Sequence, residues 1–165
     1  MTIGRRIALA ALIALLLLAD QATKHVVRTT LPGREPLHYF GVATLIFTEN
    51  PGAFLSLGSS LPPRLRTLLF DGVVAIGLGI ALVALFLGRI PQRGGDDIAL
   101  ALIVAGGVGN LIDRVRFHGR VTDFIYLAAG PLHTGVFNIA DMAITTGVLW
   151  LLATWAFHRE RGLGA

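Results

Sequence analysis

One segment of the chain, Leu68 to Leu87, runs for 20 residues with a single charged side chain, Asp71. An α-helix needs about 20 apolar residues to cross the hydrocarbon core of a bilayer, so this segment predicts a transmembrane helix. The chain as a whole is 54% hydrophobic and 15% charged, with a mean hydropathy of +0.71, which lies outside the normal range of soluble domains. We therefore expect most of the chain to face lipid.

Three further apolar segments predict three more spans. They run from Ile7 to about Val27, from about residue 96 to Ile112, and from Phe137 to Phe157. Arg5 and Arg6 make the first segment resemble a secretory signal peptide. Its apolar character continues past the length of such a leader, however, and the other segments need a helix to pack against, so we interpret it as a span.

The segment between the first two spans is long and mixed in character. Its stretch from Leu37 to Thr48 is rich in Tyr, Phe, Val, Ile and Thr, which predicts a small sheet at the membrane surface. The predicted fold class is therefore an all-α membrane protein. Residues 1–165 form a single domain of four transmembrane helices with a small β-containing loop domain between spans one and two.

Composition and spacing exclude several classes of function. The net charge is +4, but the 14 basic residues occur in short clusters without a stripe along one face, so nucleic acid is not an expected partner. The chain has no cysteine, and its five histidines show no metal-ligand spacing. We expect no metal and no cofactor, and we expect a monomer.

An even number of spans places the unusual polar residues on one face of the bilayer. Ionisable groups at bilayer depth cost at least about 2.5–3.5 kcal/mol each, so a cluster of them at one end of a bundle suggests function. Counting basic residues on the two sides does not decide the orientation. The residues that share this face are Asp20, Lys24, Glu49, Asn50, Asn110, Asp113, Arg114, Asp123, Asn138 and Asp141.

Some of these residues are better suited to bracing a site than to chemistry. Asp20 and Lys24 are four residues apart and predict an ion pair on one helical face. Asp113 and Arg114 are interpreted as a carboxylate–guanidinium pair at a helix terminus, which is usually structural. The glycines at positions 106, 107 and 109 predict close helix approach.

Asp123 and Asp141 are the candidates for acid–base chemistry. Asp123 lies between apolar residues, and Asp141 lies in the first turn of the last span. Two carboxylates within a few ångströms share one proton, because their repulsion raises the pKa of one of them. One member can then deprotonate a water while the other hydrogen-bonds a carbonyl oxygen, as in aspartic peptidases.

Two other classes stay open at this point. A small proton- or ion-coupled transporter also carries intramembrane Asp and Asn residues, but it predicts polar groups near the midplane, whereas here they collect at one end. A non-enzymatic membrane subunit is the third possibility, and it predicts that Asp→Asn changes alter assembly.

Taken together, the motifs resemble those of one family, the type II or lipoprotein signal peptidases, which are aspartic peptidases of the bacterial inner membrane. The resemblance covers nearly the whole chain, with five motifs in order between four spans. They are Asp20 with Lys24, Asn50-Pro51-Gly52-Ala53-Phe54, the run from Gly106 to Arg114, Val121-Thr122-Asp123-Phe124, and Phe137-Asn138-Ile139-Ala140-Asp141. The second motif departs from the family in having one alanine before Phe54, and Arg64 and Arg66 compete for the family's arginine near span two.

The resemblance implies a specific activity and orientation. It implies hydrolysis of the peptide bond before a diacylglyceryl-modified cysteine of a prolipoprotein, with lipid-modified prolipoproteins and membrane lipids as partners. Both termini would be cytoplasmic, and the β-containing loop and the site would face the periplasm. Asp123 and Asp141 match the catalytic pair, and the matching residues that line or brace the site are Asp20, Lys24, Asn50, Gly52, Asn110, Asp113, Arg114 and Asn138.

Overall fold

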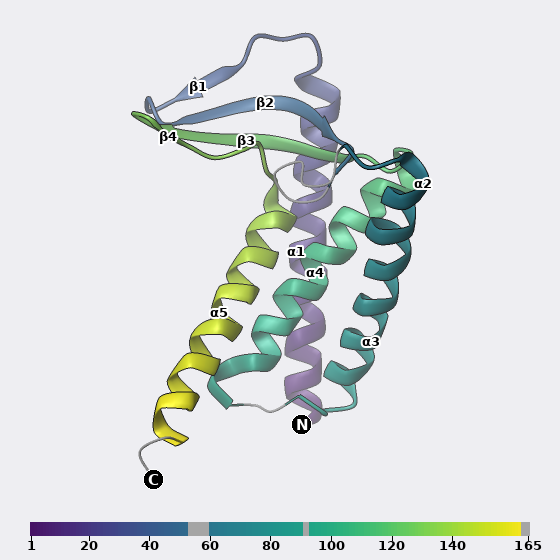
Figure 1. Ribbon diagram of the computed structural model, residues 1–165, viewed down its shortest axis with the longest axis vertical. Coiled ribbons are helices and arrows are strands. Elements are labelled where there is room, and N and C mark those ends of the chain that lie inside the picture. The colour runs from purple at the N-terminus through teal and green to yellow at the C-terminus, as the bar shows by residue number, and fades with distance from the viewer. Residues whose placement is uncertain (53–59, 91–92, 163–165) are drawn as a thin grey trace.

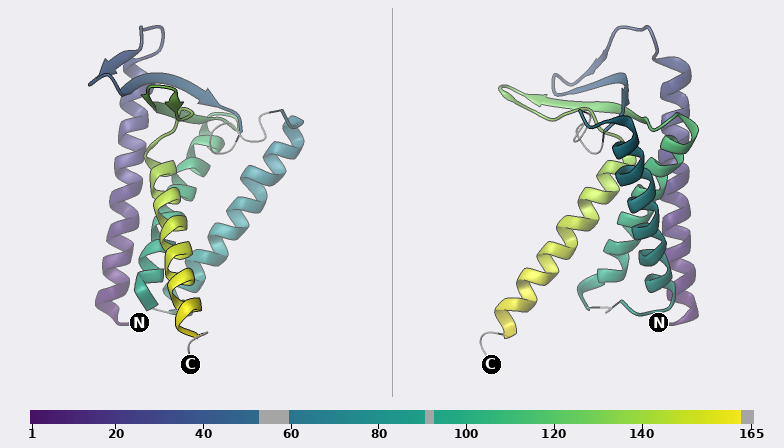
Figure 2. Two further views of the ribbon diagram at one scale, coloured as in Figure 1. Left: turned by 60° about the vertical axis from the view of Figure 1, so that its left-hand side comes forward. Right: turned by 45° about the vertical axis from the view of Figure 1, so that its right-hand side comes forward.

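The computed structural model describes residues 1–52, 60–90 and 93–162. Its helices form a bundle, and a sheet lies across one end of that bundle (Figure 1). The start of α1 and the end of α5 lie at the opposite end (Figures 1 and 2). Phe54 of the second motif lies outside the described residues.

Helical structure follows the four apolar segments. The elements are α1 (Ile3–Thr30), α2 (Pro63–Arg66), a π-helical turn (Thr67–Val73), α3 (Val74–Phe86), a short 3-10 turn (Arg93–Gly95), α4 (Asp96–Arg116) and α5 (Ile139–Gly162). Within the described residues, three helical stretches are long and apolar enough to cross a membrane, namely Pro63–Phe86, Asp96–Arg116 and Ile139–Phe157. Because α2, the π-helical turn and α3 are continuous, the second apolar helix begins five residues earlier than Leu68.

The centre of the bundle is α4, which buries more than half of its apolar stretch. Three of its glycines explain this position, because each meets a different neighbour. A Cβ on Gly106 would clash with the carbonyl oxygen of Ala140 in α5, one on Gly107 would lie 2.5 Å from Leu78 in α3, and one on Gly109 would lie 2.6 Å from Asp20 in α1. The predicted role of these glycines in close helix approach is confirmed.

The sheet has four antiparallel strands in the order β1-β2-β3-β4. They are β1 (Leu37–Tyr39), β2 (Ala43–Asn50), β3 (Val121–Ala129) and β4 (Leu132–His133). A register shift between Leu45 and Thr48 precedes the part of β2 that faces the site, where Thr48 pairs with Asp123. The end of β2 and the start of β3 are thus held side by side.

The sheet differs from the prediction in its origin. β structure was predicted in the loop between the first two apolar segments, and that loop supplies β1 and β2, but β3 and β4 come from the connection between α4 and α5. The pairing of β3 with β2 joins residues more than 70 positions apart. Local pattern does not encode that pairing, which depends on both segments leaving the bundle at the same end.

Candidate active site

Two aspartates from different elements are connected by one asparagine. Asp123 lies near the start of β3 and Asp141 in the first turn of α5, and their exposed fractions are 1% and 5%. Asn138 Nδ2 donates to Asp123 Oδ1 at 2.7 Å, and the Asn138 backbone N–H donates to Asp141 Oδ2 at 3.2 Å. The structure therefore brings the predicted pair into one buried hydrogen-bonded group.

The start of α5 explains why Asp141 is placed there. Asn138 directly precedes the helix, and its Oδ1 accepts from the backbone N–H of Asp141 at 2.9 Å while the Asp141 carboxylate accepts from the backbone of Asn138. This reciprocal pair is a capping box, which satisfies two backbone donors at a helix N-terminus. Asp141 is thus fixed by the beginning of its own helix, where the helix dipole favours a negative charge.

Two further asparagines hold the remaining carboxylate oxygens. Asn50 Nδ2 donates to Asp123 Oδ2 at 2.9 Å, and Asn110 Nδ2 donates to Asp141 Oδ1 at 2.8 Å. The Asn50 Oδ1 accepts from the backbone of Gly52 at 2.8 Å, which forms an Asx turn and aims the amide at Asp123. Each aspartate therefore receives donors on both of its oxygens.

Lys24 orients Asn110 and connects α1 to the site. Its ammonium, 2% exposed, lies 2.8 Å from Asp20 Oδ2 and 3.6 Å from Asp113 Oδ2, and it donates to Asn110 Oδ1 at 2.9 Å. An amide whose oxygen faces this cation must turn its nitrogen toward Asp141. The predicted ion pair of Asp20 and Lys24 is confirmed, and Asp20 also accepts from the backbone N–H of Ala140 at 2.9 Å.

Burial and the surrounding charges favour a proton on this pair of aspartates. Burial, and after it repulsion from the Asp141 carboxylate, raise the pKa of Asp123 to about 7. Among the buried residues that the structure describes, the carboxylates outnumber the cations, so a proton on the pair reduces an excess of negative charge. Around the pair the carboxylates are Asp20, Asp113, Asp123 and Asp141, and the cations are Lys24 and Arg114. Asp97 lies apart from them at the start of α4, where it pairs with Arg5 at 2.8 Å.

Asp113 and Arg114 serve two different partners, so the interpretation of them as an ion pair with each other was wrong. Asp113 Oδ2 accepts from the backbone N–H of Thr122 at 2.9 Å. Arg114 Nη2 donates to the carbonyl oxygen of Gly52 at 2.9 Å, and its Nε lies 3.8 Å from Asp71 Oδ1. Adjacent residues on a helix point in different directions, so the two side chains anchor different segments.

Three site residues escaped prediction from the sequence. Gln21 Nε2 donates to Asp20 and Asp113 at 3.1 and 3.2 Å, and Arg28 Nε donates to Thr122 Oγ1 at 2.6 Å. Arg28 follows Lys24 by four residues, and that spacing was a usable signal. Thr122 carries no comparable signal, because it is defined by its fully buried place in β3.

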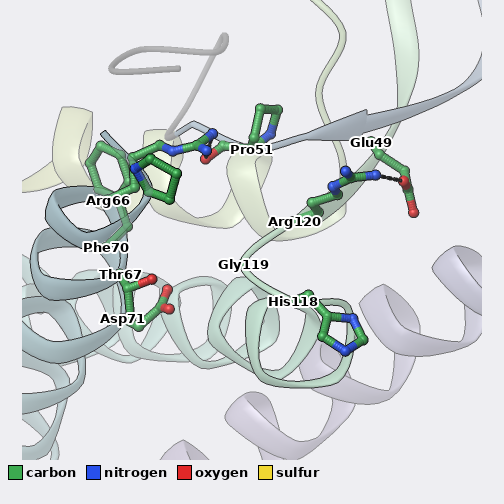
Figure 3. Close-up of a pocket in the computed structure, with 10 residues that line it drawn as sticks. Glu49, Pro51, Arg66, Thr67, Phe70, Asp71, His118, Gly119 and Arg120 are labelled. Carbon is green, nitrogen blue, oxygen red and sulfur yellow. Dashed lines mark hydrogen bonds and ion pairs between the residues drawn. The ribbon is translucent and has the colours of Figure 1, made fainter. Parts of the chain in front are cut away.

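Two pockets lie near this group. One of about 480 Å³ reaches Asp141 from the side of α5 and is lined by His133, Thr134, Phe137, Met142, Thr145 and Thr146. The other, of about 430 Å³, lies between the start of the second apolar helix and the turn after α4, and it includes neither Asp123 nor Asp141 (Figure 3). No group of three His, Cys, Asp or Glu side chains within the described ranges is arranged to hold a metal ion.

Comparison with known proteins decides the family. The model of the signal peptidase II family matches residues 12–157. The chain belongs to the signal peptidase II family. The lipoprotein signal peptidase of Syntrophus aciditrophicus is 40% identical over 139 residues, covering 84% of this chain and 85% of that protein, and that of Moorella thermoacetica is 40% identical over 142 residues, covering 85% and 87%.

Solved structures agree with this signal peptidase II assignment. A bacterial membrane enzyme determined by the in meso method at 2.3 Å resolution superposes with a TM-score of 0.74 at 27% identity, covering 96% of this chain and 92% of that one. A second, determined at 1.9 Å, gives a TM-score of 0.69 at 26% identity, covering 92% of each chain. The helical bundle with its small sheet is therefore a membrane-enzyme fold.

Proposed function

We propose that this chain removes signal peptides from prolipoproteins as an aspartic endopeptidase, with Asp123 and Asp141 as the catalytic pair. The substrate bond would be the one that precedes a diacylglyceryl-modified cysteine. The activity rests on membership of the signal peptidase II family. The observation that supports the two residues is their joint burial in one group in which asparagines donate to all four carboxylate oxygens.

The proposed chemistry needs one proton on the pair. The ionised carboxylate removes a proton from a water, whose oxygen attacks the carbonyl carbon of the scissile peptide bond, while the protonated carboxyl gives its proton to the carbonyl oxygen. The tetrahedral intermediate then collapses and the C–N bond breaks. The carboxyl that took the water's proton gives it to the departing nitrogen, and the other carboxylate takes a proton back from a hydroxyl of the intermediate, which restores the pair. The pKa of Asp123, at about 7, suits the member that begins protonated near neutral pH.

The asparagines would keep both carboxylates in place through this cycle. Asn50, Asn110 and Asn138 donate to carboxylate oxygens and cannot themselves ionise, so they stabilise the ionised form without competing for the proton. Lys24, braced by Asp20 and Asp113, would hold Asn110 in the required orientation. Gly52 and Arg114 would secure the turn that carries Asn50.

We further propose that α1 is a fourth span and that the site faces the periplasm. At about 1.5 Å per residue, the 28 residues of α1 extend about 42 Å, enough to cross a bilayer. Figure 1 supports an even number of spans, because the start of α1 and the end of α5 share one end of the bundle and the sheet lies at the other. The termini would then be cytoplasmic in the bacterial inner membrane. The enzyme would act as a monomer without metal or cofactor, taking its lipidated substrates from the bilayer.

Nearly isosteric substitutions test the proposed pair. Asp123→Asn and Asp141→Asn should each abolish cleavage of a lipidated precursor while the purified protein still unfolds at a temperature close to that of the wild type. Glu35→Gln makes the same acid-to-amide change at an exposed position and should cleave normally. Normal turnover by either aspartate variant would refute the assignment.

The same experiment separates the proposal from its rivals. A non-enzymatic subunit would show no cleavage by the wild type, and altered assembly in the variants. A proton- or ion-coupled transporter would move an ion across vesicles that contain only the purified protein. The position of the buried polar group at the sheet end of the bundle favours the peptidase, because a transporter places its ion site near the midplane.

A further inference from the structure

Arg28, near the end of α1, has contacts that the proposed chemistry does not use. Its Nε donates to Thr122 Oγ1 at 2.6 Å, and its Nη1 donates to Glu49 Oε1 at 3.0 Å. Its guanidinium carbon lies 3.4 Å from the centre of the Phe117 ring and 5.5 Å from that of Phe47. The guanidinium is thus confined by two directional hydrogen bonds and by an aromatic face.

The residue that Arg28 contacts is held on every polar atom. Thr122 is 0% exposed; its backbone N–H donates to Asp113 at 2.9 Å, and its carbonyl oxygen accepts from Asn138 Nδ2 at 3.3 Å. With the hydroxyl bound to Arg28, nothing polar on Thr122 is left to water. Since Asp123 is the next residue in β3, these hydrogen bonds fix the backbone position from which the Asp123 side chain extends.

Glu49 connects Arg28 to β2, the strand that pairs with β3. Glu49 pairs with Thr122 in the β2–β3 register, and its other carboxylate oxygen accepts from Arg120 Nη1 at 2.7 Å. The hydrogen bond from Arg120 is the main reason that the pKa of Glu49 lies below its usual value, so the carboxylate stays charged near neutral pH. Asn50, which donates to Asp123, directly follows Glu49 in β2.

We propose that Arg28 is a positioning residue that joins α1 to the ends of β2 and β3 and so sets the separation of Asp123 from Asp141. This inference rests on the proposed function. On the inward face of α1, Asp20, Lys24 and Arg28 follow one another at intervals of four residues. Asp20 accepts from the start of α5, Lys24 reaches α4, and Arg28 reaches β3, so one helix face locates the three elements that carry the site.

The planar shape of the Arg28 guanidinium matters more for this role than its positive charge. A lysine at this position would keep the positive charge but would lack the planar fork that serves Thr122 and Glu49 together and stacks on Phe117. A valine in place of Thr122 would keep the volume and lose only the hydroxyl that accepts from Arg28. The two changes therefore remove the same hydrogen bond from its two ends.

The test compares Arg28→Lys, Thr122→Val and the double variant in cleavage of a lipidated precursor. We expect each single change to lower kcat about tenfold with KM within twofold of the wild type, because small misplacement of a catalytic group mainly affects turnover. The double variant should lose no more than about twofold beyond the worse single one, because both changes remove one bond. Arg34→Lys is the matched control, since Arg34 is exposed at the turn after α1, and it should cleave normally.

Thermal unfolding separates positioning from bulk stability. If Arg28 only stabilised the fold, kcat measured well below the unfolding temperature would be normal in both single variants, and the inference would be overturned. Multiplicative losses in the double variant would also overturn it, because they would mean independent effects. Asp123→Asn tests the proposed function separately: its failure to reduce cleavage would refute the catalytic pair, whereas an inactive Asp123→Asn beside a fully active Arg28→Lys would refute only the role of Arg28.

Discussion

Asn138 has two functions that different substitutions can separate. Its Oδ1 caps α5 by accepting from Asp141 N–H at 2.9 Å, and its Nδ2 donates to Asp123 at 2.7 Å. Serine is as good as asparagine at a helix N-cap but has no amide to donate to Asp123, whereas alanine provides neither group. Asn138→Ser and Asn138→Ala therefore differ by the cap alone.

The expected magnitudes follow from these two contacts. A hydrogen bond to a charged group contributes about 1.5–3 kcal/mol. If that bond is needed in the transition state, Asn138→Ser should lower kcat/KM by about 10- to 150-fold, since each 1.36 kcal/mol is worth a factor of ten. Asn138→Ala should show the same kinetic loss, with a further loss of about 1 kcal/mol in the free energy of unfolding, because the cap is gone.

Purified variants would be compared by initial rates of cleavage of a lipidated precursor and by thermal unfolding under the same conditions. Wild-type rates for Asn138→Ser would refute the claim that the Asn138 amide supports Asp123 during catalysis. Equal unfolding temperatures for the serine and alanine variants would refute the capping interpretation, whatever the rates. Because the two readouts report on different atoms of one side chain, each conclusion can fail alone.

Three other properties can be tested in the same preparations. Because the pKa of Asp123 rises from 3.8 to about 7 on folding, its contribution to stability is present below pH 4 and is lost as the pH rises to about 7, a fall on the order of 4 kcal/mol. Between pH 4 and pH 7 the unfolding temperature should therefore fall less steeply with pH for Asp123→Asn than for the wild type. An unchanged dependence on pH would contradict the raised pKa. Gly106→Ala should destabilise the bundle by about 1–3 kcal/mol because the added methyl meets the backbone of Ala140, while Gly77→Ala, which has open space, should not. Lys24→Met should lower the free energy of unfolding by about 3–5 kcal/mol, because it leaves the buried carboxylates Asp20 and Asp113 without their cation. The loss would be measured as a lower unfolding temperature.

The features that could be predicted from the sequence depend on local spacing, on the length of an apolar segment or on the number of spans. The apolar segments predict helices because their length and composition are sufficient, and the Asp20–Lys24 ion pair follows from helical spacing. An even number of spans placed the polar residues at one end, which agrees with where the buried network lies. These inferences require no knowledge of which elements touch.

The remaining features depend on contacts between distant segments. The pairing of β2 with β3 brings Asn50 to Asp123 across 73 residues, and nothing in either strand alone specifies that partner. Asp113 was given the wrong partner for a similar reason: its nearest charge in sequence is Arg114, but its bonds go to Lys24 and to the backbone of Thr122. Neighbours in sequence are poor guides to neighbours in a buried polar network.

The arrangement around α4 shows how a charge on α1 is connected to the proposed catalytic pair through one amide. Gly109 lets Asp20 approach the central helix, and the next residue, Asn110, lies between Lys24 and Asp141. A catalytic pair that ionises in a low-dielectric site needs a fixed positive charge nearby, but a cation in direct contact would hold both carboxylates ionised and remove the shared proton. The neutral amide of Asn110 meets both requirements, because it places the positive charge near the pair without direct contact. Its oxygen accepts from the Lys24 ammonium, which polarises the amide, and its nitrogen donates to Asp141. Lys24 on α1, one amide away from the pair, is therefore better placed than a cation on α5 itself would be.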